Sequence, residues 1–374
     1  MSGPADQGFG LRYLILMLTD RCNLACDYCY NRGLQLGDMT EAAILRIFDI
    51  FGPGTEPLHV QLTGGEPTLR PDLLEAAVKA ARKLKRRVSV GLQTNGTLID
   101  SPMALRLKKL RLEVGVSLDG LPAVNEITRG GSRALIRGLM ALESHKVPFR
   151  VTTVVSSANV DHLSQTAVLF GGLAAACGVG LDLLSKAGRP ARVGPAAKEQ
   201  LKKSVFDFAR KLREVNLTRG RKLTFRELEM LIKSLNSPRR SQFCRAGAGD
   251  SLCVRPDGAL FPCGQTARSE ALKIGHLNDL SGQQLPNQSI FRSPLTCLTL
   301  YSQKCVECVL AGRCPGECPG RLWSNPDGGK LACAMWRGLY EAVKGFPELG
   351  LMASGPKDFL EHPGPQSIQP TAAK

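Results

Sequence analysis

The chain has 374 residues, of which 43% are hydrophobic and 22% charged, and its formal net charge is +16. This size and apolar content predict a large α/β domain with a smaller second unit. The N-terminal string MSGPADQGFG lacks the basic and apolar regions of a signal peptide, and no long apolar run follows it early in the chain. We therefore expect a cytoplasmic protein with no membrane span, in which the 13 cysteines serve mostly as metal ligands and do not form disulfides.

Short apolar runs alternate with amphipathic segments from about residue 11 to 185. Thr40 is a plausible helix N-cap, and Pro71 and Pro102 suit a first helical turn. Strands that alternate with helices predict a parallel sheet with right-handed crossovers, either a partial (βα)6 barrel or an open doubly wound sheet. The predicted strands are 12–18, 58–63, 87–93, 113–118, 149–155 and 179–184, and the predicted helices are 40–51, 71–86, 102–110, 132–145, 160–177 and 196–214.

The remainder of the chain has a different composition. Residues 215–243 form a basic connection with one predicted helix near 225–235, which links a first unit at 11–214 to a second at 244–345. In the second unit cysteine, glycine and proline are dense, and apolar periodicity is too weak for a hydrophobic core alone. Residues 1–10 are expected to be flexible and the Pro- and Gly-rich residues 346–374 to be disordered.

Three cysteines follow the first predicted strand, in the string CNLACDYC. Cys22, Cys26 and Cys29 offer three thiolates where a [4Fe–4S] cluster needs four, which leaves one iron open. A structural zinc site is the alternative, but this trio lacks a fourth local ligand. The spacing, with Tyr28 before the last cysteine and the strand-like LRYLILMLT before the first, resembles the signature of the radical SAM superfamily.

That resemblance implies a partial (βα)6 barrel in which S-adenosylmethionine (SAM) chelates the open iron and is cleaved to a 5′-deoxyadenosyl radical. LTGGEP at 62–67 matches the family motif that binds the SAM amino group, and its glycines allow close approach of the backbone. QTNG at 93–96 and SLDG at 117–120 match positions that line the SAM pocket, although Asn-Gly and Asp-Gly are also ordinary turns. The candidate SAM-binding residues are Tyr28 near the adenine, Gly64, Gly65, Glu66, Pro67, Asn95, Ser117, Asp119 and Arg129.

A second cysteine pattern begins at Cys244. Gly258 and Cys263 follow, then Cys305-x2-Cys308-x5-Cys314-x3-Cys318, and finally Cys333. This order resembles the seven-cysteine pattern of the SPASM domain, an extension of radical SAM enzymes that holds two auxiliary [4Fe–4S] clusters. Two structural zinc sites are the alternative, because Cys-x2-Cys pairs occur in both kinds of site.

By the same resemblance, one auxiliary cluster would be held by Cys305, Cys308, Cys314 and Cys333, and the other by Cys244, Cys263 and Cys318. The fourth ligand of the latter is open, and Cys253 is the candidate. VRPDGALFPC predicts a hairpin with a type I′ turn at Asp257-Gly258, which would bring Cys253 and Cys263 to the same side. Cys297 is a second candidate for this ligand, although a spare buried thiol is the favoured interpretation. Cys177, expected at a helix end, is interpreted as a buried small apolar residue.

SPASM proteins of this size are mostly peptide modifiers, so the resemblance implies hydrogen abstraction from a peptide substrate and an oxidative modification such as a crosslink or thioether. The alternatives are an anaerobic sulfatase-maturing enzyme, which makes formylglycine, and a tetrapyrrole or cofactor-biosynthesis enzyme. Sulfatase-maturing enzymes generally carry an Asp as general base directly after the cysteine matching Cys263. Gly264 stands there in this chain and cannot accept a proton.

The radical derives from SAM, so no catalytic side chain is expected. The first predicted strand starts near residue 11, which leaves no room for a fused leader-binding module, so a separate leader-peptide-binding protein is expected where one is needed. The positive charge would suit an acidic electron donor of the flavodoxin or ferredoxin type, or an acidic peptide. Basic residues lie in helical stretches such as Lys79–Arg87 and Lys202–Lys222, so solvated helix faces explain them equally well. No nucleic-acid or membrane partner is expected.

Overall fold

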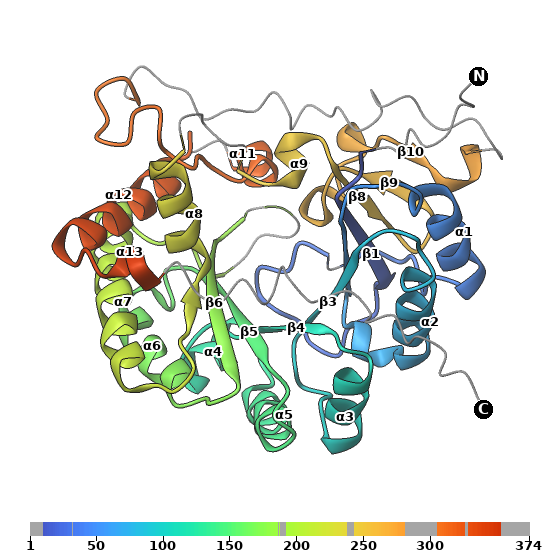
Figure 1. Cartoon of the computed structure of the whole chain (residues 1–374), viewed down its shortest axis with the longest axis horizontal. Coiled ribbons are helices and arrows are strands. Elements are labelled where there is room, and N and C mark those ends of the chain that lie inside the picture. The colour runs from blue at the N-terminus through green and yellow to red at the C-terminus, as the bar shows by residue number, and fades with distance from the viewer. Residues whose placement is uncertain are drawn as a thin grey trace, which may run out of the picture.

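A computed structural model describes residues 10–31, 33–185, 187, 192–237, 243–280, 305–325 and 328–352. Its centre is a curved sheet whose strands run in the order β10-β9-β8-β1-β2-β3-β4-β5-β6-β7, with helices covering its outer face (Figure 1). Strands β1 to β7 pair in parallel, which confirms the partial (βα)6 barrel. The barrel strands are β1 Tyr13–Thr19, β2 Leu58–Gly64, β3 Val88–Thr94, β4 Glu113–Ser117, β5 Phe149–Val155, β6 Ala176–Leu183 and β7 Thr224–Phe225.

Each barrel strand buries alternate side chains against the helices and turns the others toward the lumen. Leu14, Leu16 and Leu18 of β1 belong to the outer core, whereas Tyr13 lies on the lumen side. Thr40 caps α1 by accepting from the Ala43 amide, as predicted. The barrel helices are α1 Glu41–Phe51, α2 Pro71–Ala81, α3 Ser101–Lys109, α4 Pro122–Thr128, α5 Ser132–Ser144, α6 Leu163–Gly171, α7 Lys198–Thr218 and α8 Arg226–Leu235.

The six main strands were predicted correctly, but the helix predicted at 160–177 is wrong at its end. Helix α6 stops at Gly171, and β6 starts at Ala176, so Cys177 lies in a strand and not at a helix end. The guanidinium of Arg219, which follows α7, donates to the carbonyls of Leu173 and Ala176 at 3.0 and 2.8 Å. These bonds fix the turn between α6 and β6. Helix α2 also ends at Ala81, well before the predicted residue 86.

The cysteine-rich half extends the barrel sheet. Strands β8 Ser251–Val254 and β9 Ala259–Phe261 form the predicted hairpin, β10 Gly275–His276 pairs with β9, and β8 runs parallel to β1. The type I′ turn is wrong, because among the described residues only Arg111 and Lys146 are non-glycines with positive φ, so Asp257 is not left-handed. The Gly258 amide instead donates to the Arg255 carbonyl, and Pro256 favours the type I geometry at that turn.

Four more helices complete the described chain: α9 Arg245–Ala248, α11 Pro319–Ser324, α12 Lys330–Gly345 and α13 Leu349–Met352. Helix α12 lies along α7 (Figure 1), and its buried Trp336 and Leu339 belong to the same core as the barrel. Gly338 permits this contact, since a Cβ there would lie 2.4 Å from the Lys202 carbonyl oxygen. Within the described ranges, no helix combines the length and apolarity needed to cross a membrane.

Candidate functional site

The loop that carries Cys22, Cys26 and Cys29 follows β1 at the carboxyl edge of the sheet, where parallel barrels place their chemistry. Cys22 is exposed and the other two are half-buried. Asp20 anchors the far side of this loop by accepting from the amides of Leu36 and Gly37, and buried Asp27 accepts from the Val193 amide at 2.8 Å. The loop is thus tied down before its first cysteine and again between its second and third.

The glycines of the LTGGEP string pack against the cysteine loop itself. The Gly65 amide donates to the Thr19 carbonyl at 2.7 Å, and the Glu66 amide donates to the Arg21 carbonyl at 2.8 Å. A Cβ on Gly64 or Gly65 would lie 2.2 Å from the carbonyl oxygen of Thr19 or Arg21. The sequence predicts that these glycines allow a ligand to approach the backbone closely. In the described chain, the glycine turn instead makes its close contacts with the backbone of the cysteine loop.

Glu66 is completely buried, and four donors bind its carboxylate. The amide and hydroxyl of Thr68 and the Thr94 hydroxyl donate to Oε1, and the Asn95 amide donates to Oε2 at 2.7 Å. Burial raises the pKa of Glu66, and these hydrogen bonds oppose the rise. Glu66 therefore connects the glycine turn to the end of β3.

Asn95 and the neighbouring loop polar groups point toward the first cysteine. The Asn95 side-chain amide lies 3.9 Å from the Cys22 sulfur and donates to Asn23 Oδ1 at 2.9 Å, and the Leu24 amide lies 3.4 Å from the same sulfur. Donors aimed at a sulfur stabilise its thiolate form. Burial raises the pKa of Cys26 to about 11, so its thiolate needs a positive group such as iron at neutral pH.

Tyr28, Asp119 and Arg129 lie together behind the cysteine loop. The Tyr28 hydroxyl donates to Asp119, whose other oxygen lies 3.0 Å from Arg129 Nε, and the Arg129 guanidinium lies 5.5 Å from the Tyr28 ring centroid. Asp119 is fully buried and also accepts from the Val154 amide. These three predicted residues support one another, and their contact with SAM stays a prediction, as does that of Pro67.

Asn31 is a residue that sequence reasoning missed. Its side-chain amide donates to the Gly64 carbonyl at 3.1 Å, while its Oδ1 is buried and has no hydrogen-bond partner in the described part of the chain. An unpaired buried acceptor beside the glycine turn is costly unless a ligand donates to it. An ammonium group, such as the amino group of SAM, fits this position. The only sequence signal for this role was the position of Asn31, two residues after Cys29.

Three of the later cysteines lie near one another across the sheet extension. Cys244 ends the segment before α9, Cys263 follows β9, and Cys318 precedes α11. Burial raises the pKa of Cys318, and the thiolates of Cys263 and Cys244 raise it further. Burial also raises the pKa of Cys263 to about 11, with Cys244 the next contributor. A site for one cluster, with three cysteine ligands, is consistent with this grouping.

Cys253 lies in β8, near Cys263. It is opposite Phe261 in the hairpin and is completely buried in an apolar cluster with Ile15 and Met17. Burial raises its pKa strongly, and Cys263 adds to that rise. Whether Cys253 is a fourth ligand stays a prediction.

The second predicted auxiliary set surrounds the start of α12. Burial raises the pKa of Cys333, and the nearby thiolates of Cys305 and Cys308 raise it further. A guanidinium nitrogen of Arg337 lies 3.7 Å from the Cys308 sulfur. Cys314 packs against the main core. Cys297 lies outside the described residues. Among the described residues, no group of three or more His, Cys, Asp or Glu side chains is arranged to hold a single metal ion. An iron–sulfur cluster requires a different arrangement, because each thiolate binds a separate iron.

Tyr30 lies near both cysteine regions. Burial raises its pKa above the usual range, and the thiolates of Cys263 and then Cys29 add to the effect, followed by Asp182 of β6. Tyr30 is thus close enough to interact electrostatically with the first cysteine loop and with the sheet extension. The first cysteine loop and the Cys263 region therefore both lie near Tyr30.

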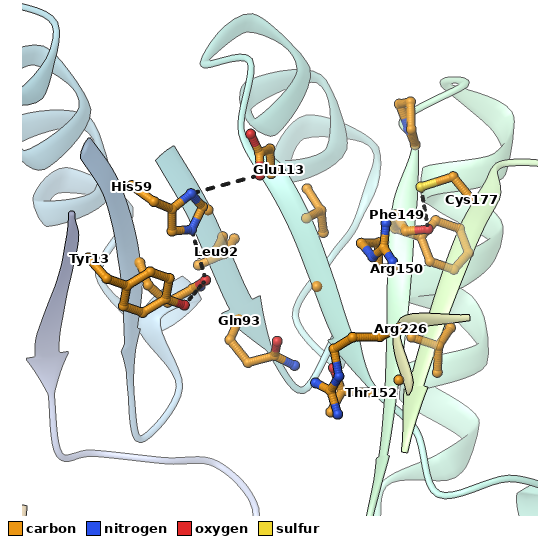
Figure 2. A pocket seen from close by; sticks show the side chains of 17 residues that line it. Tyr13, His59, Leu92, Gln93, Glu113, Phe149, Arg150, Thr152, Cys177 and Arg226 are labelled. Carbon is orange, nitrogen blue, oxygen red and sulfur yellow. Dashed lines mark hydrogen bonds and ion pairs between the residues drawn. The ribbon is translucent and has the colours of Figure 1, made fainter. Parts of the chain in front are cut away.

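A cavity of about 280 Å³ lies in the lumen of the barrel. Figure 2 shows polar side chains from several strands pointing into it, among them His59, Glu113 and Arg150. The Tyr13 and His59 rings stack at 5.0 Å, and burial raises the pKa of Glu113 to about 7 despite the nearby Arg150. Gln93 borders the cavity and donates to Ser117 at 2.9 Å, which links the cavity to a predicted SAM-binding residue.

Comparisons with known proteins agree with this architecture. The family model described as the radical SAM superfamily matches residues 16–169. An uncharacterised protein of Methanocaldococcus jannaschii is 30% identical over 74% of this chain and 92% of that protein. A cysteine-type anaerobic sulfatase-maturating enzyme of Clostridium novyi is 23% identical over 88% of this chain and 94% of its own length. The solved structure of anSMEcpe with AdoMet and the Kp18Cys peptide superposes with a TM-score of 0.75 at 21% identity, covering 92% and 99% of the two chains.

Proposed function

The chain belongs to the radical SAM superfamily, and we propose that it abstracts a hydrogen atom from a peptide substrate to give an oxidative modification such as a crosslink or thioether. The observation that carries this proposal is the proximity of two cysteine regions to one residue. The thiolates of Cys263 and Cys29 both raise the pKa of Tyr30, so both regions lie near it. A substrate bound beside Tyr30 would lie near both regions.

Residues 11–214 would form the radical SAM part and residues 244–345 the SPASM part. Cys22, Cys26 and Cys29 would hold a [4Fe–4S] cluster that, when bound, supplies the electron for cleavage of SAM and leaves an iron for its amino and carboxylate groups. Asn31 Oδ1 and the Gly64–Gly65 backbone would orient the SAM amino group. Asn95, which donates toward the Cys22 sulfur, would stabilise negative charge on the thiolate and so favour the reduced, more negative cluster.

The cysteine-rich half would hold two auxiliary [4Fe–4S] clusters. Cys305, Cys308, Cys314 and Cys333 would bind one, and Cys244, Cys263 and Cys318, with Cys253 as the candidate fourth ligand, the other. Their position beyond the barrel mouth supports an oxidative reaction, because the electron left on a substrate radical needs an acceptor. An acidic flavodoxin or ferredoxin would serve as the external donor, and a separate leader-binding protein would present the peptide where one is required.

Gly264 favours a small peptide over a sulfatase as the substrate. A Cβ at this position would have only Ile15 Cγ2 near it, at 4.0 Å, and Gly264 is not among the glycines with positive φ. Neither space nor backbone conformation requires glycine here, so the chain has room for a carboxylate base and lacks one. The solved anSMEcpe structure with a bound peptide supports a peptide substrate more generally.

Anaerobic reconstitution with iron, sulfide, SAM and dithionite tests the proposal. We expect 5′-deoxyadenosine to form. A candidate peptide encoded beside the gene should lose two hydrogens per turnover, measured by mass spectrometry. The variant with Cys22, Cys26 and Cys29 replaced by alanine should retain auxiliary iron but form no 5′-deoxyadenosine. A cluster-loaded wild type that makes no 5′-deoxyadenosine would overturn the proposal.

Sulfatase maturation is the second candidate, because the Clostridium novyi enzyme matches over nearly its whole length. A peptide carrying a sulfatase active-site cysteine distinguishes the two. Formylglycine formation by the wild type would favour the second candidate. SAM cleavage without formylglycine would favour modification of a different peptide.

A further inference from the structure

A cluster of exposed cations surrounds the end of the barrel opposite the cysteine loop. Helices α2, α3 and α5 end there side by side (Figure 1). The Arg82 guanidinium donates to the Leu110 carbonyl and the Lys108 amine donates to the His145 carbonyl at 2.8 Å, so the turns after these helices are tied together. We call the exposed cations on these turns the basic rim: Lys83, Lys85, Arg87, Lys109, Arg111 and Lys146.

The basic rim has no compensating acidic partners. None of its six side chains makes an ion pair within the described ranges, in contrast to α7, where Arg210 and Lys211 are paired with Glu214. Glu75 of α2 is paired with Arg106, and the carboxylate of Glu143 in the last turn of α5 accepts from the Ala175 amide at 2.8 Å. Six like charges on adjoining turns produce a positive potential that attracts anionic partners and depends on salt.

Two members of the basic rim occupy a backbone conformation that L-amino acids disfavour. Arg111 has φ 45° and Lys146 has φ 51°, and no other non-glycine in the described chain has positive φ. Each ends a helix: the Leu112 amide bonds the Leu107 carbonyl, and the Val147 amide bonds the Leu142 carbonyl. Glycine is the preferred residue at this position of a helix end. Both turns carry a cation instead, which motivates a role for the charge itself.

The geometry points to an acidic polypeptide segment as the occupant of the basic rim, and this inference rests on the proposed peptide substrate. Strand β3 has seven residues between the rim and the site, so the two are separated by roughly 20 Å. A partner bound at the rim therefore contacts it with a part distant from the reacting residue, as an extended peptide can. No member of the rim is aromatic, so the stacking surface that single-stranded nucleic acids use is absent from it.

We propose that the basic rim binds an acidic stretch of the substrate peptide outside the segment that is modified. The probe is a fluorescently labelled decaglutamate, titrated by anisotropy into the full-length, cluster-loaded protein at low and raised salt. The test variant is Lys109→Gln/Arg111→Gly/Lys146→Gly, and the matched control is Arg133→Gln/Arg137→Gln/Lys203→Gln, which removes three exposed cations elsewhere. The test variant should bind about tenfold more weakly than wild type, with a shallower salt dependence, and the control should bind like wild type.

Stability separates this effect from misfolding, because glycine at positions 111 and 146 relieves the disfavoured φ and should raise the melting temperature while binding falls. Equal binding by wild type and the test variant overturns the inference. Tighter binding of an oligouridylate of the same length also overturns it, in favour of a nucleic acid. SAM cleavage without peptide should be unchanged in both variants, so a failure of rim binding is distinguished from a failure of the proposed enzyme activity.

Discussion

At the scale of single residues, Glu66 shows how a motif side chain can organise a site without being exposed in it. Its two carboxylate oxygens accept from Thr68, Thr94 and Asn95 and join the glycine turn to β3. The sequence marked Glu66 as a SAM-pocket residue. The bonds that define its role come from a strand that lies far away in sequence.

Replacing Glu66 by Gln tests this role. The amide NH2 of Gln would face either the Asn95 amide or the Thr68 amide, so a donor would be left unpaired in a buried place. We expect the free energy of unfolding to fall by about 2 kcal/mol, measured by denaturant titration. The control is Glu199→Gln, which makes the same substitution at an exposed position and should leave the free energy of unfolding unchanged. Unchanged stability of Glu66→Gln would contradict the bridging role.

Glu113 gives a pH-dependent prediction at the same scale. Burial holds its pKa at about 7, above the ordinary value of 4.5. The folded protein therefore keeps a proton that the unfolded chain releases, and stability falls as the pH rises from about 4.5 to 7. Glu113→Gln mimics the protonated form and should be more stable than wild type by about 2 kcal/mol at pH 8, with little difference near pH 4.5.

Denaturant titrations of wild type and Glu113→Gln at both pH values measure this difference. The side chain of Glu113 retains 26% exposure, so the expected gain is set below the full shift. A gain that is the same at acid and alkaline pH would show that packing, and not the carboxyl proton, is responsible.

At the scale of elements, two glycines in site-forming turns look alike in sequence and differ in structure. A Cβ on Gly65 would lie 2.2 Å from the Arg21 carbonyl oxygen, whereas a Cβ on Gly264 would meet only Ile15 at 4.0 Å. Gly65 is therefore required by the contact between two turns. At Gly264, in the turn after β9, no contact requires glycine.

This difference predicts opposite outcomes for two substitutions. Gly65→Ala should lower the free energy of unfolding by about 2 kcal/mol or more and weaken SAM binding, because the turn must move off the cysteine loop. Gly264→Asp should change stability by no more than about 0.5 kcal/mol. Thermal unfolding and calorimetric SAM titration of both variants provide the test, and strong destabilisation by Gly264→Asp would show that the turn does not tolerate a side chain.

At the scale of the whole molecule, the cysteine-rich half and the barrel share one sheet and one core. Strand β8 pairs with β1 from Tyr13 to Leu16, and α12 buries Trp336 and Leu339 in the barrel core. A chain ending at Ser237 would expose the β1 edge and the α7 face that α12 covers. We expect it to aggregate and to lack a cooperative thermal transition.

The control for this truncation is a chain ending at Met352, which keeps all described elements and should unfold cooperatively. Size-exclusion chromatography and circular dichroism measure both. A monomeric, cooperatively folding chain that ends at Ser237 would show that the barrel is an independent unit.

Local sequence signals were sufficient for the elements that depend on local physics. The alternation of apolar residues located six strands, Thr40 marked the start of α1, and Pro256-Asp257-Gly258 marked the hairpin, though not its turn type. The end of α6 could not be predicted, because it depends on carbonyls that bind Arg219 from the end of a later helix. Likewise, nothing local indicated that Asn31 Oδ1 would be buried without a partner.

The sequence by itself determined the chemistry available to this protein: the number, order and spacing of its cysteines, and the strand-to-loop positions of the first three. Spacing along one chain segment is a local property, so it can be recognised without a fold. Only the tertiary structure decided which groups meet: Tyr30 near both Cys29 and Cys263, the cysteine-rich hairpin as an extension of the sheet beside β1, and the basic rim at the far end of the barrel. These depend on contacts between segments far apart in sequence, which no local pattern encodes.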